Sequence, residues 1–186
     1  DRRIGPHFLQ PGPGFGGSCF PKDARALLDL ADRHGLDFPI LKAAVEVNAA
    51  RQERMADQVM AAVDGVDDPV VALWGLAFKA GTDDTRESPA LHIGESLARR
   101  GAVVRAYDPK ATTDGPIKVC SSALAATEGA DVLVVATEWS EFTEVNPVAV
   151  FAAMRGDLVM DLRNLLDAEQ IRAAGLRLQG IGKPSS

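Results

Sequence analysis

Short apolar runs alternate with longer amphipathic segments over the second two-thirds of the chain. Each run is too short for a helix and is typical of a strand that is buried on both faces of a parallel sheet. The runs are VVALW (70–74), VVRAY (103–107), DVLVVA (131–136), DLVMD (157–161) and LRLQGI (176–181), and IKV (117–119) predicts a short additional strand. Strands that alternate with helices predict a doubly wound parallel sheet.

Helices are predicted between these strands. Ser88 and Pro89 form a favourable helix start, because a serine N-cap precedes a proline at the first helical position, and Gly101 ends that helix. Shorter helices are predicted at 121–128, 148–154 and 168–174.

The first third of the chain has a purely helical pattern. A helix is predicted over 21–33, with an apolar stripe formed by Ala24, Leu27, Leu28 and Ala31. Residues 40–63 contain no Gly or Pro and are followed by Asp64-Gly65, which predicts one helix about 35 Å long. Its apolar side either spans the core or contacts a second copy of the chain, and helix length alone does not decide between these.

The pattern as a whole predicts an α/β fold in two parts. Residues 1–64 form a helical region with the long helix, and residues 65–186 form a Rossmann-like doubly wound parallel sheet.

Composition narrows the classes of partner. The 186 residues are 46% hydrophobic and carry 20 basic and 26 acidic side chains, a net charge of −6. No run of Lys or Arg is long enough to track a phosphate backbone, so nucleic acid is not expected as a partner. The longest apolar stretch, 69–78, is half the length of a membrane span. We therefore expect a soluble, cytoplasmic protein without membrane contact, and free thiols at Cys19 and Cys120.

The stretch GPGFGGSCFPKDARAL (12–27) fits the G-x-G-x-x-G spacing of a dinucleotide-binding loop through Gly12, Gly14 and Gly17. That fingerprint must follow a strand and open a helix. A helix does follow, but prolines at 6, 11 and 13 break any preceding strand. The glycines are therefore better explained as the surroundings of the cysteine that follows them.

Cys19 is the strongest candidate for chemistry. It lies just before the helix at 21–33, where the partial positive charge of the helix end favours a nucleophilic thiolate. A small buried hydrophobe is the alternative, but the crowded glycines let a ligand approach the backbone and so favour chemistry. Asp23 suits a first helical turn for structural reasons, whereas Lys22 is unfavourable there unless an anion such as a cofactor phosphate lies nearby.

Further candidates lie beyond the predicted strand ends. The first strand, helix and second strand, ending at Asp108, have the outline of a nucleotide-binding βαβ unit, but the loop 75–88 lacks the three glycines. Ligands of such sheets bind beyond the carboxyl ends of the strands, where Lys79, Arg86 and Arg163 are predicted. Surface pairing of Lys79 and Arg86 with Asp83 and Asp84 is the alternative. His7, His34 and His92 have neither metal-ligand spacing nor an obvious acid partner, so no metal site is predicted.

These motifs together resemble a known family. FLQPGPGFGGSCFPKD (8–23), GLAFKAGTDDTRESPAL (75–91), YDPKA (107–111) and DLRNLL (161–166) are similar, in content and order, to motifs of the nucleotide-sugar dehydrogenases, the UDP-glucose and GDP-mannose dehydrogenase family. The likeness covers nearly all of the chain. Two runs in this order are highly specific for the family, namely Gly-Gly-Ser-Cys-x-Pro-Lys-Asp and, downstream of it, Phe-Lys-x-x-Thr-x-Asp-x-Arg-Glu-Ser.

The resemblance implies an activity and a set of site residues. Members oxidise a sugar C6 alcohol to a carboxylate and reduce two NAD. By resemblance, Cys19 attacks the intermediate aldehyde, and the resulting thiohemiacetal is oxidised to a thioester that water opens with help from Asp23. The residues expected to hold the nucleotide-sugar are Phe8, Leu9, Gly12, Phe15, Gly16, Phe78, Lys79 and Arg163. Lys22 and Arg86 are expected to contact NAD, and the helix at 40–63 is expected to form a homodimer.

Parts of the family pattern are absent from this sequence. These are the amino-terminal NAD-binding domain and the lysine and asparagine that steady the oxyanion. We therefore expect the carboxyl-terminal part of such an enzyme, inactive alone. The motif GPGFGGSCF resembles the UDP-glucose enzymes most and so favours UDP-glucose as the substrate, with GDP-mannose or a UDP-N-acetylhexosamine as alternatives. A non-catalytic nucleotide-binding module, and a thiol hydrolase with a histidine base near Cys19, are the competing classes.

Overall fold

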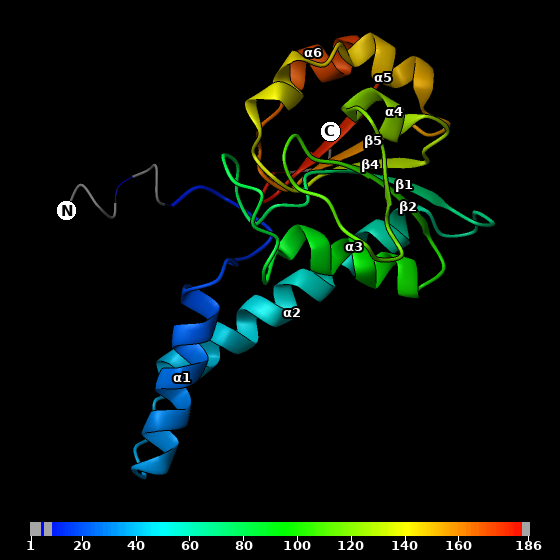
Figure 1. Ribbon diagram of the computed structural model, residues 1–186. Coiled ribbons are helices and arrows are strands. Elements are labelled where there is room, and N and C mark those ends of the chain that lie inside the picture. Colours follow the sequence, from blue (N-terminus) through cyan, green and yellow to red (C-terminus); the bar gives the residue numbers. More distant parts are fainter. Residues whose placement is uncertain (1–4, 6–8, 184–186) are drawn as a thin grey trace.

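The computed structural model describes residue 5 and residues 9–183, and in this part of the chain a six-stranded sheet lies between helices on both faces (Figure 1). The helices are α1 (Phe20–Arg33), α2 (Pro39–Ala62), α3 (Pro89–Arg99), α4 (Ala123–Thr127), the 3-10 helix η2 (Ser140–Glu144), α5 (Pro147–Ala153) and α6 (Ala168–Ala173). The strands are β1 (Val70–Trp74), β2 (Val103–Tyr107), β3 (Lys118–Val119), β4 (Val132–Val135), β5 (Leu158–Asp161) and β6 (Arg177–Gly180).

The strands run parallel in the order β3-β2-β1-β4-β5-β6. The chain changes direction across the sheet between β1 and β4, which is the switch point of a doubly wound fold. The predicted fold class is thereby confirmed. Residues that directly follow β1, β4 and β5 lie at the same edge of the sheet, because all strands point the same way.

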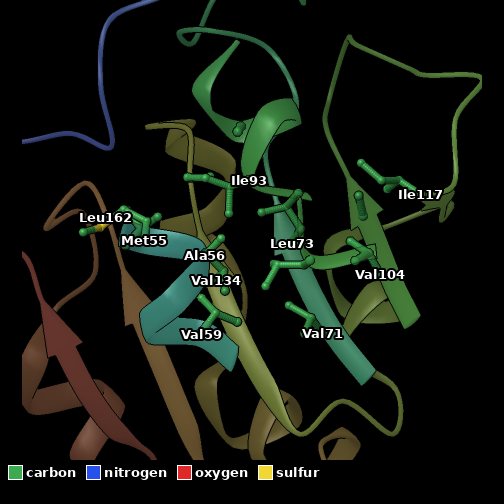
Figure 2. Close-up of a cluster of buried hydrophobic side chains, with 14 of the residues drawn as sticks. Met55, Ala56, Val59, Val71, Leu73, Ile93, Val104, Ile117, Val134 and Leu162 are labelled. Atoms are coloured by element: carbon green, nitrogen blue, oxygen red, sulfur yellow. The ribbon is translucent and has the colours of Figure 1, made fainter. Parts of the chain in front are cut away.

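One face of the sheet is covered by α3 and by the second half of α2. Figure 2 shows Ala56 and Val59 of α2 beside Val134 of β4, and all three side chains are buried. Met55 and Val63 extend the same stripe. The core interpretation of the predicted long helix therefore holds for its second half, where each fully buried large side chain contributes about 1.5–3 kcal/mol.

The other face is covered by α4, α5, α6 and η2 (Figure 1). Trp74 at the end of β1 packs against Phe142 of η2, with ring centroids 5.1 Å apart. The indole N–H of Trp74 donates to the carbonyl of Ala123 at 2.9 Å, so this buried polar group is satisfied.

The predicted elements match the structure to within a few residues. Ser88 caps α3 as expected, and its hydroxyl accepts a hydrogen bond from the N–H of Leu91. The strand predicted at 131–136 is shorter, at Val132–Val135, and the two N–H groups that follow it, of Ala136 and Thr137, both donate to the carbonyl of Trp74. The helix η2 had no apolar period and was not predicted.

Helix α1 and the first half of α2 extend away from the sheet as a helical pair (Figure 1). The pair leaves large apolar side chains exposed, namely Phe20, Leu27, Leu30, Leu36, Phe38, Ile40 and Val47. Of the helices in the described ranges, none combines the length and the apolar character needed to span a bilayer.

Candidate functional site

The glycine-rich loop (residues 12–18) lies against residues that follow the strands of the sheet. Gly17 donates its N–H to the carbonyl of Arg86 at 3.0 Å, in the loop between β1 and α3. Gly12 lies against the guanidinium of Arg163, just after β5. The fold therefore joins the predicted cysteine motif to the predicted binding residues of the sheet.

Cys19 occupies the N-cap position of α1, as predicted, and its side chain is exposed. The carbonyl of Cys19 accepts a hydrogen bond from the N–H of Asp23 at 2.8 Å, so the spacing of one helical turn places Asp23 on the same side of the helix as Cys19. The hydroxyl of Ser18 lies 3.6 Å from the Cys19 sulfur. An exposed thiol at the positive end of a fourteen-residue helix is suited to nucleophilic attack.

At two positions of the glycine-rich loop, neighbouring atoms lie too close to leave room for a side chain. A Cβ on Gly16 would overlap the carbonyl oxygen of Glu87. Gly17 has a φ of +89°, and a Cβ on it would lie 2.9 Å from the ring of Phe78. The glycine-rich loop and the loop between β1 and α3 are thus in direct contact, and an ion pair between Arg25 and Glu87 at 2.7 Å fastens α1 to the same loop.

Arg163 forms a bridge at the carboxyl end of the sheet. Its Nε donates to the carbonyl of Ala136 at 2.9 Å, and its Nη2 donates to the carbonyl of Phe78 at 3.2 Å. The carboxylate of Glu138 lies 3.1 Å from Nε. Burial lowers the pKa of Arg163, while Glu138 and Asp161 act in the opposite direction. The guanidinium is therefore a fixed cation, with Nη1 directed toward Gly12.

Phe78 and Lys79 follow β1 in the same region. Phe78 is half-buried, and its N–H donates to the carbonyl of Asp84 at 3.1 Å. Lys79 is exposed, with its Nζ 5.4 Å from the centre of the Phe78 ring. The surface pairing considered for Lys79 is not seen, since no ion pair joins it to another described residue. Its ammonium is available for an anionic ligand.

Arg86, in contrast, does pair with an acid at the surface, as the alternative interpretation of its sequence predicts. Its guanidinium donates two hydrogen bonds to Asp84, at 2.9 and 2.8 Å, and these lower the pKa of Asp84 to about 2. The pKa of Arg86 is raised mainly by Asp84, with a smaller contribution from the nearby Cys19. Lys22 is paired with Asp23 at 3.2 Å on the exposed side of α1.

Asp108, directly after β2, accepts hydrogen bonds from other groups of the protein. Its carboxylate accepts hydrogen bonds from the N–H groups of Leu76, Ala77, Lys110 and Ala111 and from the indole of Trp139. In a dinucleotide site, these N–H groups and this acid would face the cofactor. Within the described residues, the βαβ unit therefore does not form a dinucleotide cradle.

The middle of α2 supplies residues that the sequence did not single out as functional. Asn48 makes two hydrogen bonds with the backbone of Phe15, and Arg51 donates to the carbonyl of Gly12 at 2.8 Å. His92, for which no acid partner was expected, lies 2.7 Å from Glu53. This contact is the main cause of the lowered pKa of Glu53. No local signal marks such residues, because their partners are distant in the sequence.

The remaining predicted residues are placed as follows. Phe15 stacks edge-on against Phe20, with centroids 4.7 Å apart. Leu9 is 67% exposed, and Phe8 and His7 lie outside the described residues. Over the part of the chain that is described, no three His, Cys, Asp or Glu side chains are grouped as a metal site would need.

Comparisons with known proteins agree with this arrangement. Residues 72–168 match the UDP binding domain of the UDP-glucose/GDP-mannose dehydrogenase family, and residues 1–50 match the central domain of the same family. The chain is 40% identical over 190 residues to a UDP-glucose 6-dehydrogenase of Rickettsia conorii, an alignment that covers 98% of this chain and 44% of the relative. It is 42% identical over 196 residues to one of Pseudomonas aeruginosa, covering 99% and 43%.

Solved structures give the same result. A UDP-glucose dehydrogenase of Pyrobaculum islandicum superposes with a TM-score of 0.82 at 30% identity, covering 99% of this chain and 41% of that one. A UDP-D-ManNAc dehydrogenase of Pyrococcus horikoshii gives 0.77 at 34% identity, covering 92% and 40%. The chain thus spans less than half the length of the relatives that it matches.

Proposed function

Because the chain belongs to the UDP-glucose/GDP-mannose dehydrogenase family, we propose that it supplies the thiol nucleophile and the nucleotide-sugar site of an NAD-dependent UDP-glucose 6-dehydrogenase. The product is UDP-glucuronate, formed by oxidation of the sugar C6 alcohol to a carboxylate. The observation that carries the proposal is the direct packing of the Cys19 loop on Phe78 and Arg163.

The proposed roles in binding follow from charge and position. Lys79 and Arg163 are cations at the carboxyl end of the sheet and suit the diphosphate of a nucleotide-sugar. The glycine-rich loop, including Gly12, Phe15 and Gly16, lies over the same region and would cover the sugar. Phe8 and Leu9 are proposed as further contacts from the segment that precedes this loop.

The proposed chemistry centres on Cys19. Its thiolate sulfur bonds to the carbon of the C6 aldehyde and the carbonyl oxygen takes up a proton, which gives a thiohemiacetal. After oxidation of that carbon, the bond to sulfur is a thioester. Water then adds to the thioester carbon, and the leaving sulfur regenerates the Cys19 thiolate. Asp23, on the same side of α1 as Cys19, would receive a proton from that water.

NAD would accept the hydride in both oxidation steps. The βαβ unit of the described residues does not fit a dinucleotide, because Asp108 already occupies the N–H groups of its first loop. Lys22 and Arg86 are compatible with contacts to the cofactor phosphates, since both are exposed cations close to Cys19. We propose that a part of the enzyme other than these residues holds the rest of NAD.

The choice of UDP-glucose is supported by the relatives. The Rickettsia and Pseudomonas proteins, at 40% and 42% identity, are both UDP-glucose 6-dehydrogenases. The Pyrococcus structure, a UDP-D-ManNAc dehydrogenase, keeps a UDP-N-acetylhexosamine as the second candidate. A non-catalytic nucleotide-binding module is the alternative class, but such a module would need neither an exposed cysteine at a helix start nor the glycines around it.

The proposal also covers the division of the chain into two regions and its assembly into a homodimer. We divide the chain into a catalytic-cysteine and central helical region, residues 1–64, and a nucleotide-sugar-binding domain, residues 65–186. The second half of α2 belongs to the first region in sequence and packs on the sheet of the second. The first half of α2 carries exposed apolar side chains, and we propose that these form a homodimer contact.

Calorimetry on the 186-residue chain tests the substrate class. We expect heats of binding with UDP-glucose and with UDP, and weaker binding of GDP-mannose. Lys79→Ala should weaken UDP-glucose binding about tenfold, because it removes one charge-assisted contact. Lys118→Ala is the matched control, since Lys118 is exposed on the short edge strand β3. Equal affinities of the wild-type and Lys79→Ala proteins, or an absence of heat with UDP-glucose, would contradict the proposal.

A further inference from the structure

The Cys19 loop is held from one side by a polar face of α2. Asn48 accepts a hydrogen bond from the N–H of Phe15 at 2.8 Å and donates one to the carbonyl of the same residue at 3.1 Å. Three residues further along α2, Arg51 donates to the carbonyl of Gly12 at 2.8 Å. A spacing of three places both side chains on the same face of the helix.

The Asn48 contact depends on the particular chemistry of an amide. Only a side chain with both a donor and an acceptor can satisfy the N–H and the C=O of one residue. The loop is adapted to this approach, since a Cβ on Gly14 would lie 2.7 Å from the Asn48 oxygen. The hydrogen bonds of Asn48 to Phe15 are partly shielded from water, which strengthens them relative to exposed ones.

The contact is connected to Cys19 through two aromatic rings. Phe15, which Asn48 holds, packs edge-on against Phe20 at a centroid distance of 4.7 Å. Phe20 is the first residue of α1 and follows Cys19 directly. A shift of Phe15 would therefore be transmitted to the helix start that presents the thiol.

The same helix is anchored to the sheet. On α2, Glu53 accepts hydrogen bonds from Ser96 of α3 at 3.0 Å and from Arg100, the C-cap residue of α3, at 2.7 Å, and Asp57 pairs with Arg100. His92 of α3 also contacts Glu53. One rigid helix thus binds the cysteine loop through one face and α3 through another.

We propose that Asn48 is a positioning residue for Cys19, supported by Arg51, and that α2 through these side chains fixes the thiol relative to the edge of the sheet. This inference rests on the proposed function and adds to it. The hydrogen bonds of Asn48 go to Phe15, which packs on Phe20 beside Cys19, and none joins Asn48 to Lys79 or Arg163, the cations proposed for the diphosphate. Although Phe15 is also proposed to lie over the sugar, we therefore expect Asn48 to affect the rate of the chemical step more than substrate binding.

The first test is the alkylation rate of Cys19 by iodoacetamide at neutral pH in the 186-residue chain, with Cys120 as an internal reference in the same sample. Asn48→Ala should slow the alkylation of Cys19 about threefold, because the released loop no longer holds Cys19 beside the backbone of Arg86, to which Gly17 of the same loop donates its N–H at 3.0 Å. The rate at Cys120 should not change. Gln58→Ala, an amide truncation at an exposed position of α2, should leave both rates at the wild-type value. An unchanged Cys19 rate in folded Asn48→Ala protein overturns the inference.

A second variant, Asn48→Asp, keeps the test decisive if Asn48→Ala does not fold. It has the same size but lacks the donor to the Phe15 carbonyl at neutral pH. If Asn48→Ala unfolds, which a faster Cys120 would reveal, Asn48→Asp decides the matter by the same criterion. A slower Cys19 with an unchanged unfolding temperature supports the inference, and a wild-type rate contradicts it.

Turnover separates this inference from the proposed function. In the dehydrogenase that contains this chain, both Asn48 variants should lower kcat about tenfold and leave KM for UDP-glucose within about threefold of the wild-type value. A rise in KM with unchanged kcat would make Asn48 a part of substrate binding and overturn the positioning role. A wild-type enzyme that does not oxidise UDP-glucose would contradict the proposed function. In that case the alkylation rates of Cys19 would still test whether Asn48 positions the thiol.

Discussion

Gly16 lies where the cysteine loop meets the backbone of Glu87, and a methyl group there would overlap the Glu87 carbonyl oxygen. Gly17 beside it meets the ring of Phe78. The glycines that fit the dinucleotide spacing make close contacts of the same kind, since a Cβ on Gly12 would lie 2.9 Å from Arg163, one on Gly14 2.7 Å from Asn48 and one on Gly17 2.9 Å from Phe78. Their density serves the close approach of two loops, and one of these loops carries Cys19.

Replacing Gly16 by Ala should lower the free energy of unfolding by about 1–3 kcal/mol, because the overlapping atom belongs to the backbone and cannot rotate away. Urea denaturation of the 186-residue chain gives this value. Gly115→Ala is the matched control, since the nearest atom to a Cβ at Gly115 is the Thr113 hydroxyl oxygen at 3.7 Å. Equal stabilities of the two variants would show that the loop does not pack as described.

Residues with local signals were predictable, and residues with distant partners were not. Cys19 and Ser88 were placed correctly because a helix start is recognised from a few adjacent residues. Asn48 binds a residue 33 positions away, and His92 binds Glu53 across 39 positions. The family resemblance did single out Phe78, Lys79 and Arg163, and the structure places all three beside one edge of the sheet.

At the scale of elements, α2 has two different halves. Its second half lies in the core, and its first half exposes Ile40 by 82% and Val47 by 66%. These two residues are seven positions apart and therefore share a face of the helix. The strands β1, β4 and β5 were predicted well because burial on both faces makes them continuously apolar, whereas η2 is short and mixed in composition.

We predict that the chain is a dimer at micromolar concentration and that Val47→Glu makes it a monomer, because a charge in an apolar contact is desolvated without a partner. Sedimentation velocity measures the change. Val148→Glu is the control, since Val148 is 60% exposed on α5, on the side of the sheet opposite α2. A folded wild-type chain that sediments as a monomer would remove the homodimer from the account.

At the scale of the whole molecule, two sequence regions make one site. The cysteine loop comes from the first part of the chain, and the cations Lys79 and Arg163 come from the loops that follow β1 and β5. Helix α2 connects the two regions through the cysteine loop and α3. The carboxylate of Asp108, directly after β2, already accepts hydrogen bonds from the N–H groups of Leu76 and Ala77, so these groups do not face a dinucleotide, and the proposed nucleotide-sugar site lies at the carboxyl end of the sheet.

The most direct test of the central claim, that Cys19 is the nucleophile of a nucleotide-sugar dehydrogenase, is NADH release from UDP-glucose by the enzyme that contains this chain. The wild-type enzyme should release two NADH for each UDP-glucuronate formed. Cys19→Ser should abolish steady turnover, because a serine hydroxyl without an activating base is a far weaker nucleophile than a thiolate. Cys120→Ser, at the free cysteine outside the site, should keep wild-type turnover. Wild-type turnover in Cys19→Ser would contradict the account.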